Sequence, residues 1–230
     1  MPIKTVFFDA GNTLVFGDFE RILAPLRERG VSPSQEQLYA AERVAKRRLD
    51  DARAHHSSVD AQFWDIYYNH LLEELGITDP GLTTTLTALT RTSVNWRRVL
   101  PGTRETLERL RRRFRLGIIS NSDGHIRDLF EAVALADCLD SFTDSGLVGH
   151  EKPDARIFQA ALRSLDAEAG ESIYIGDIYS VDYVGAKEAG LHAALMDLSG
   201  TYRGDGLPRL ESLAEVEEML EGASSQSPVS

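Results

Sequence analysis

The sequence has a single cysteine, no long apolar run and too few basic residues to balance its acidic ones. Cys138 has no second cysteine in the chain to pair with, which excludes an intramolecular disulfide and is typical of the reducing cytoplasm. The N-terminal apolar run stops at Asp9, too early for a secretory signal peptide, and no apolar stretch approaches membrane-spanning length. We therefore expect a cytoplasmic protein with no membrane partner.

Basic residues are scarce relative to acidic ones: 25 Lys and Arg stand against 36 Asp and Glu, a net charge of −11. A nucleic acid backbone would be repelled rather than neutralised, so no nucleic acid partner is expected, although a local basic site can still bind a small anion. The 230 residues suffice for one large domain, or for one domain with a second inserted into it. We expect a monomer or a homodimer.

Four short apolar runs alternate with amphipathic helical patterns and dominate two parts of the chain. Continuous apolar character is typical of strands that are buried on both faces of a parallel sheet. The fold class that this alternation predicts is α/β, a three-layer α/β/α Rossmann-like core with helices on both faces of the sheet. The predicted strands are 3–9, 115–121, 172–177 and 191–196, and the helical patterns between them are 105–114, 125–134, 155–165 and 182–190.

The alternation fails between residues 18 and 97, where four helical patterns follow one another without a convincing strand. A segment of this size is comparable to a small domain. We interpret it as an α-helical bundle that is inserted, as a cap, into a core made of residues 1–17 and 98–222. The polar residues 223–230 are predicted to form a flexible tail.

Chemically useful side chains stand where the predicted strands end. Asp9, Ser120 and Asp177 end three strands, while Lys152 and Asp182 lie in or beside the loops that follow. The carboxyl ends of parallel strands meet at one edge of a sheet, which is where ligands bind in such folds. Two carboxylates, a hydroxyl and a lysine suit metal-assisted phosphoryl transfer, although each residue alone also suits a helix cap or a turn.

The order and spacing of these residues resemble the haloacid dehalogenase superfamily of hydrolases across the whole predicted core. Asp9 begins a motif that continues through Leu14, and Ser120 ends an apolar strand as in the family's second motif. The third motif is matched by Lys-Pro-Asp at 152–154 and the fourth by Gly-Asp at 176–177 followed by Asp182. The helical insertion after the first motif resembles the family's α-helical cap.

The resemblance implies a Mg²⁺-dependent site with Asp9 as the nucleophile. Asp182 would hold either the waters of the metal or Lys152, and Lys152 would also neutralise Asp9. The implied metal site consists of Asp9, Asp177, Asp182 and the backbone carbonyl of Gly11, and the implied substrate site of Ser120, Asn121, Lys152 and Thr13.

Gly11 departs from the family's phosphatases, which have there a second Asp that protonates the leaving oxygen. General acid–base catalysis contributes about 10²–10⁴-fold, so alkyl phosphate esters should be poor substrates while acyl and aryl phosphates suffer least. Three alternatives stay open: a nearly inactive relative that binds metal and phosphate, a 2-haloacid dehalogenase, and a phosphonate hydrolase with a Schiff-base lysine in its cap.

A cap residue could replace the missing acid, but the sequence offers candidates by residue type alone. We expect all of them to be exposed surface residues, together with His125 and His150 near the motifs. Trp64, Tyr67 and Tyr68 are expected to pack in the core of the cap. The candidate acids are Glu42, Lys46, His55 and His56.

Overall fold

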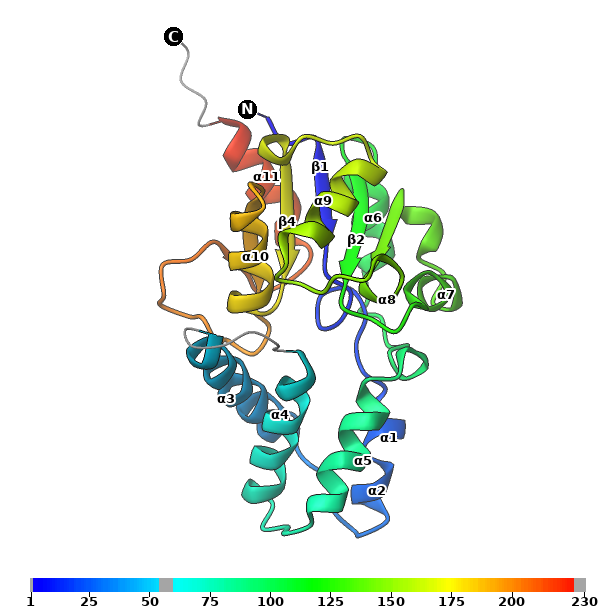
Figure 1. The fold of residues 1–230 in the computed structure, drawn as a ribbon, viewed down its shortest axis with the longest axis vertical. Helices are drawn as coiled ribbons and strands as arrows, with labels where there is room; N and C mark the ends of the chain where they lie inside the picture. Colours follow the sequence, from blue (N-terminus) through cyan, green and yellow to red (C-terminus); the bar gives the residue numbers. More distant parts are fainter. Residues whose placement is uncertain (1, 54–59, 226–230) are drawn as a thin grey trace.

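The computed structural model describes residues 2–53 and 60–225, and its upper half in Figure 1 is built around a parallel β-sheet. The six strands that these residues form follow the order β3-β2-β1-β4-β5-β6, and every neighbouring pair is parallel. The predicted α/β class with a parallel sheet is therefore confirmed. The strands are β1 (Thr5–Phe8), β2 (Arg115–Ser120), β3 (Ser141–Asp144), β4 (Ser172–Gly176), β5 (His192–Met196) and β6 (Arg209–Leu210).

Both faces of the sheet are buried, as the continuous apolar character of its strands indicated. Side chains alternate between the faces of a strand, so Val6 and Phe8 join one apolar cluster and Phe7 joins another on the opposite side. The first cluster includes residues of α6, α7 and α11, and the second includes residues of α9 and α10. The core helices are α6 (Thr103–Leu110), α7 (Ile126–Ala132), α8 (Ser145–Val148), α9 (Ala155–Ser164), α10 (Val184–Glu188) and α11 (Glu215–Ser225), with the short helices η2 (Ala136–Cys138), η3 (Ala169–Glu171) and η4 (Tyr179–Tyr183).

Two strands were missed by the sequence analysis. β3 reads SFTD, which holds one large apolar residue, and β6 has only two residues at the edge of the sheet. Neither shows the apolar run that marks a buried strand. The helix predicted over 182–190 also begins differently, because a π-helical turn, η4, precedes α10. The predicted tail lies mostly beyond the described residues, since α11 ends at Ser225.

The helices between β1 and α6 lie together below the carboxyl ends of the strands (Figure 1). We call this half of the structure, made of the described residues within 18–97, the cap. The first predicted helical pattern forms two short helices, because Pro25 has no N–H to continue the first. The apolar core of this half contains Tyr67 and Tyr68, as predicted, and also Ile178 and Val181 of the sheet domain. The helices are α1 (Phe19–Ile22), α2 (Ala24–Arg27), α3 (Gln35–Arg53), α4 (Asp60–Glu74), α5 (Pro80–Thr90) and η1 (Ser93–Asn95).

The two connections between the halves run side by side. Phe16 N donates to Arg98 O at 2.7 Å, and Arg98 N donates to Phe16 O at 3.1 Å. These residues adjoin the boundaries at 17/18 and 97/98 that we expect from the sequence. The paired backbones fix the point from which the helical half extends over the sheet.

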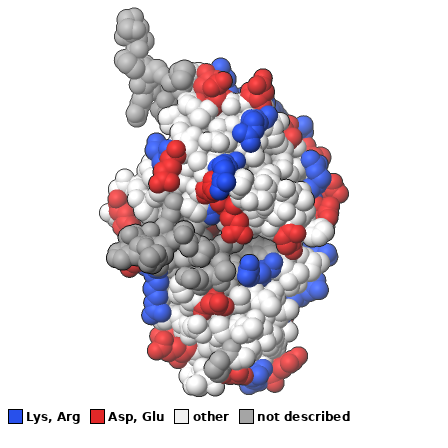
Figure 2. All heavy atoms as spheres, in the orientation of Figure 1, with Lys and Arg blue, Asp and Glu red and all other residues white. Residues whose placement is uncertain are grey.

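Charges of both signs are interspersed over the face of the molecule that Figure 2 shows, on the sheet half and on the helical half alike. Within the described residues, no helix is both long and apolar enough to cross a membrane.

Candidate active site

The sheet register brings Asp9, Ser120 and Asp177 to one edge. Phe8 lies beside Ile118 on β2 and beside Ile175 on β4, so the three strands β1, β2 and β4 end at the same edge of the sheet. The backbone N–H of Asp9 still donates to Ile175 O at 2.8 Å, which fixes the first residue beyond the strand. The side chains of all three residues line one cavity of about 190 Å³.

Lys152 is the centre of a buried hydrogen-bond network at this edge. Its ammonium Nζ lies 2.6 Å from Asp9 Oδ1, 2.8 Å from Asp182 Oδ1 and 2.8 Å from the Tyr174 hydroxyl. An ammonium has three N–H donors, so these contacts use all of them. Asn121 holds the lysine's backbone, because Lys152 N donates to Asn121 Oδ1 at 2.7 Å and Asn121 Nδ2 donates to Lys152 O at 3.1 Å.

Asp182 accepts four hydrogen bonds and thereby orients both Lys152 and the loop after β4. Its Oδ1 contacts Lys152 and the hydroxyl of Tyr174, and its Oδ2 accepts from the backbone N–H groups of Asp177 and Ile178. A Cβ at Gly176 would lie 2.5 Å from Cγ of Asp182, so only glycine allows this close approach. Asp182 therefore acts on Lys152 and on the position of Asp177.

The carboxylates of this site are poorly solvated. Burial raises the pKa of Asp9 to about 7 against the opposing effect of Lys152, and Asp182 and Asp177 raise it further. Burial likewise raises the pKa of Asp177 to about 6, against the opposing effect of Lys46. Burial alone would lower the pKa of Lys152, but Asp182 and Asp9 outweigh it and raise that pKa. The lysine therefore stays protonated between two carboxylates.

Lys46 of α3, one of the candidate acids, reaches this site from the cap as a buried side chain. Its side chain is 1% exposed, and its Nζ contacts Glu42 at 2.6 Å and Asp177 Oδ2 at 3.0 Å. Our expectation that Glu42 and Lys46 are exposed surface residues was therefore wrong. Asp177 and Glu42 outweigh burial and raise the pKa of Lys46, and Lys46 does not line the cavity. A Schiff-base lysine needs a neutral amine, so this placement gives a phosphonate hydrolase no support.

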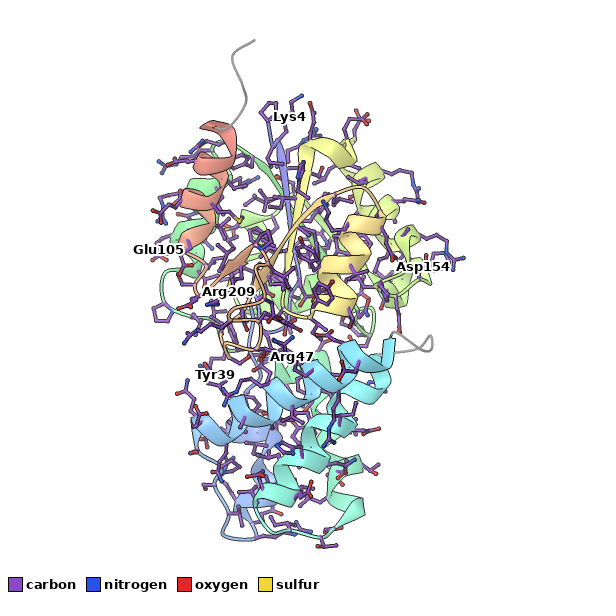
Figure 3. The ribbon with its side chains drawn as sticks, turned by 90° about the vertical axis from the view of Figure 1, so that its left-hand side faces the viewer. Lys4, Tyr39, Arg47, Glu105, Asp154 and Arg209 are labelled. Carbon is purple, nitrogen blue, oxygen red and sulfur yellow. The ribbon has the colours of Figure 1, made fainter. Side chains whose placement is uncertain are left out.

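One polar stripe of α3, made of residues 43, 46, 47 and 50, holds the cap against the core. Arg43 and Arg47 donate to the carbonyls of Ser199 and Thr201 at 3.1 and 2.7 Å, and Figure 3 labels Arg47 where α3 meets the core. One turn further along, Asp50 accepts from Ser180 N at 2.9 Å. Positions 43, 46, 47 and 50 share one helix face, a spacing that is visible in the sequence.

Aromatic rings of the cap form one side of the cavity. Phe63, Trp64 and Trp96 all line it, and the two indoles meet edge to face with ring centroids 5.7 Å apart. Trp64 also packs against the apolar core of the cap, as predicted, so it contributes to both. The aromatic side of the cavity was not predicted from the sequence.

The remaining predicted residues occupy varied places. Thr13 is 3% exposed, its hydroxyl has no hydrogen-bond partner within the described residues, and it does not line the cavity. Asn12 has a φ of 53°, the left-handed conformation that asparagine tolerates. His125 is exposed, as expected, and His150 is half-buried. His55 and His56 lie outside the described residues.

The charge balance of the site suits a divalent cation. When ionised, the four carboxylates of Asp9, Asp177, Asp182 and Glu42 face only two lysines, Lys46 and Lys152, which leaves two negative charges uncompensated. Within the described residues, no group of three or more His, Cys, Asp or Glu is arranged to hold a metal. Mg²⁺ commonly needs only one or two carboxylates besides water and substrate oxygens, so Asp9 and Asp177 fit that ion.

The sheet order, the strand-end aspartates and the helical cap together define a hydrolase of the haloacid dehalogenase type. The family model for haloacid dehalogenase-like hydrolases matches residues 3–190, so the chain belongs to this family. The resemblance predicted from the motifs is thereby confirmed.

Individual relatives are similar over different lengths. The bovine haloacid dehalogenase-like hydrolase domain-containing protein 3 is 38% identical over 99 residues, which is 43% of this chain and 39% of that protein. The glyceraldehyde 3-phosphate phosphatase of Methanothermobacter thermautotrophicus is 28% identical over 85% of this chain and 86% of its own length. The crystal structure of the HAD-hydrolase YfnB from Bacillus subtilis, bound to magnesium, superimposes with a TM-score of 0.68 at 20% identity, over 96% of this chain and 99% of YfnB.

Proposed function

We propose that this chain is a Mg²⁺-dependent phosphohydrolase that acts on a small phosphorylated metabolite through an aspartyl-phosphate on Asp9. The observation that carries the proposal is the contact of 2.6 Å between Asp9 Oδ1 and Lys152 Nζ at the wall of a cavity. A carboxylate oriented by a fixed ammonium and adjoining a substrate-sized space is suited to nucleophilic attack on phosphorus.

The residues divide the reaction between them. Lys152 holds one oxygen of Asp9, so the carboxylate is oriented before the substrate arrives. Asp9 attacks phosphorus while the bond from phosphorus to the leaving oxygen breaks and its electron pair goes to that oxygen. The hydroxyl of Ser120, at the end of β2, donates to a phosphoryl oxygen. Water then attacks the phosphorus of the aspartyl-phosphate, which releases inorganic phosphate and restores Asp9. Mg²⁺ held by Asp9, Asp177 and the Gly11 carbonyl would offset the charge on the phosphoryl oxygens.

Two observations narrow the substrate. A relative that is named a glyceraldehyde 3-phosphate phosphatase matches 85% of this chain, which supports a small phosphorylated metabolite. Gly11 has no side chain to protonate the leaving oxygen, so acyl and aryl phosphates should react faster than alkyl esters. Asp123, which also lines the cavity, has a lowered pKa, against the effect of its burial, because Ser93 donates hydrogen bonds to it. It is therefore ionised and does not replace the missing acid.

The test is phosphate release from acetyl phosphate and para-nitrophenyl phosphate, with and without Mg²⁺, by wild type and Asp9→Asn. We expect Mg²⁺-dependent turnover that Asp9→Asn reduces at least about 10³-fold, because the nucleophile is lost. Asp154→Asn is a matched control, since Asp154 caps α9 away from the cavity. Magnesium binding without turnover would favour a non-catalytic relative, and chloride release from a 2-haloacid would favour a dehalogenase.

We also propose that the enzyme works on small molecules in the cytoplasm. The net charge of −11 and the interspersed surface charges support a small-molecule substrate over nucleic acid or an anionic membrane (Figure 2). A cytoplasmic setting agrees with the single cysteine, and we propose that the protein is a monomer or a homodimer. Light scattering after size exclusion decides between monomer and homodimer.

A further inference from the structure

The space above Gly11 is filled by Trp96. A Cβ built on Gly11 would lie 3.1 Å from Cζ3, 3.4 Å from Cη2 and 3.6 Å from Cε3 of the indole. The six-membered part of the ring therefore stands over the position where the family's phosphatases have an acidic side chain. The glycine two residues after Asp9 and the tryptophan 85 positions later form one matched contact.

Trp96 is held in this place by the cap. Its Nε1 donates to the carbonyl of Thr90 at the end of α5, at 2.6 Å, and its ring meets Trp64 edge to face. The hydroxyl of Thr90 in turn contacts the hydroxyl of Tyr68 at 2.5 Å, inside the apolar core of the cap. Both indoles are only partly buried and line the cavity that holds Asp9. The aromatic surface is thus fixed beside the nucleophile.

We propose that Trp96 and Trp64 bind the leaving group, and that the substrates are aryl phosphates or similar monoesters whose leaving group is planar and departs as a stable anion; this inference rests on the proposed function. A planar ring can stack on, or meet edge to face, the indoles that replace the acid. A phenol loses its proton near pH 10, far more readily than an alkyl alcohol, so its anion can leave without a general acid.

The reaction balances without that acid. Asp9 forms a bond to phosphorus while the bond from phosphorus to the aryl oxygen breaks, and its electron pair stays on the aryl oxygen. The phenolate takes a proton from solvent after it leaves. Water attacks the phosphorus of the aspartyl-phosphate, which yields inorganic phosphate and the Asp9 carboxylate.

The first test measures binding with probes that share one head group. Phenylphosphonate and methylphosphonate are compared by the quenching of tryptophan fluorescence, which reports on this cavity because Trp64 and Trp96 are the only two tryptophans. We expect wild type to bind phenylphosphonate about 10-fold more tightly than methylphosphonate. In Trp96→Leu, which has lost one of the two fluorophores and is therefore measured by calorimetry, this preference should fall to about 2-fold.

Phe142→Leu controls for the loss of an aromatic ring, because Phe142 is half-buried on β3 against Phe130 and away from the cavity. The 10-fold preference should persist in this variant. If Trp96→Leu fails to fold, Trp96→Phe should keep part of the preference. An equal affinity for the two phosphonates in wild type, or a preference that survives in Trp96→Leu, would overturn the proposal.

The second test separates the ring from the leaving ability. Para-nitrophenyl phosphate and acetyl phosphate leave readily with and without a ring, and benzyl phosphate and ethyl phosphate leave poorly with and without one. We expect kcat to follow leaving ability, whereas KM should be about 10-fold lower for benzyl than for ethyl phosphate. Turnover with equal KM values for benzyl and ethyl phosphate would contradict the binding of the leaving group by the indoles, while the proposed function would stand. No turnover of any of the four would contradict the proposed function, and the phosphonate affinities would still decide the ring preference.

Discussion

The two halves of the candidate site differ in how they present their groups to a ligand. On the sheet side, the three donors of Lys152 and the two oxygens of Asp182 are all used in hydrogen bonds inside the protein. On the cap side, Trp64 and Trp96 present partly exposed rings to the cavity. The sheet half is organised before a substrate arrives, and the cap half supplies the surface that a substrate must fit.

The difference follows from the origin of each half. Strand ends are fixed by the hydrogen bonds of a parallel sheet, so charges that they carry can be held in place by short contacts. Helices of the cap are positioned by packing and by one polar stripe of α3. We therefore expect the chemistry to depend on the sheet half and the specificity to depend on the cap half.

The largest effect should come from Lys152→Met in the sheet half. The substitution leaves Asp9 and Asp182 without their shared cation in a buried place, which removes about 3–5 kcal/mol from the free energy of unfolding. Turnover of para-nitrophenyl phosphate should fall at least about 10³-fold, because Asp9 loses its orientation and the site its positive charge. Denaturant titration and initial rates measure the two quantities.

Lys187→Met is the matched control, since Lys187 lies exposed on α10 and carries the same side chain. It should change neither stability nor rate appreciably. A Lys152→Met protein with normal turnover would mean that the sheet half is not the organised half.

The next effect concerns Lys46, the cap residue that enters the sheet half. Lys46→Met leaves Glu42 and Asp177 unpaired, so the metal-free protein should lose about 3 kcal/mol in its free energy of unfolding. Mg²⁺ should bind about 10-fold more tightly, because the cation that contacts Asp177 is gone. Calorimetric titration with Mg²⁺ measures the affinity directly and does not depend on turnover.

Arg48→Met tests the same helix on its exposed side, and both its stability and its Mg²⁺ affinity should equal those of wild type. An unchanged or weaker affinity in Lys46→Met would show that Lys46 does not compete with the metal for Asp177.

The sequence was informative for the sheet half and much less so for the cap half. Short apolar runs end at Asp9, Ser120 and Asp177, and parallel pairing alone brings those ends together. No comparable rule predicts where Lys46 and Trp96 lie, because their positions depend on which helix faces pack on the core. The charged residues of α3 at 43, 46, 47 and 50 do share one face, but a charged face is usually exposed to solvent. The contact between Gly11 and Trp96 is not marked by any local pattern.

An effect of similar size should appear in the pH dependence of the metal-free protein. Burial raises the pKa of Asp9 to about 7 from its ordinary value of 3.8. A carboxyl with a raised pKa stabilises the folded state below its unfolded pKa, and this stabilisation is lost as the pH rises towards 7. In EDTA, wild type should therefore lose about 3 kcal/mol of unfolding free energy between pH 5 and pH 8 relative to Asp9→Asn.

Saturating Mg²⁺ should flatten this difference, because a cation favours the ionised carboxylate over the whole range. Denaturant titrations of both proteins at each pH provide the measurement. A wild-type stability that rises with pH relative to Asp9→Asn would give the opposite sign and contradict a raised pKa of the buried Asp9 carboxyl.

The smallest effect tests the contact where the two halves meet. Gly11→Asp alone should not increase the turnover of ethyl phosphate, because the new Cβ would lie 3.1 Å from the ring of Trp96. Gly11→Asp combined with Trp96→Ala opens the space for a carboxyl beside Asp9, and the rate with ethyl phosphate should rise about 10-fold over Trp96→Ala alone, or about 1.4 kcal/mol of barrier. The ring preference for phosphonates should be lost in the same double variant. A gain from Gly11→Asp alone would mean that Trp96 yields readily, and that the cap half is less rigid than its contacts with Thr90 and Trp64 indicate.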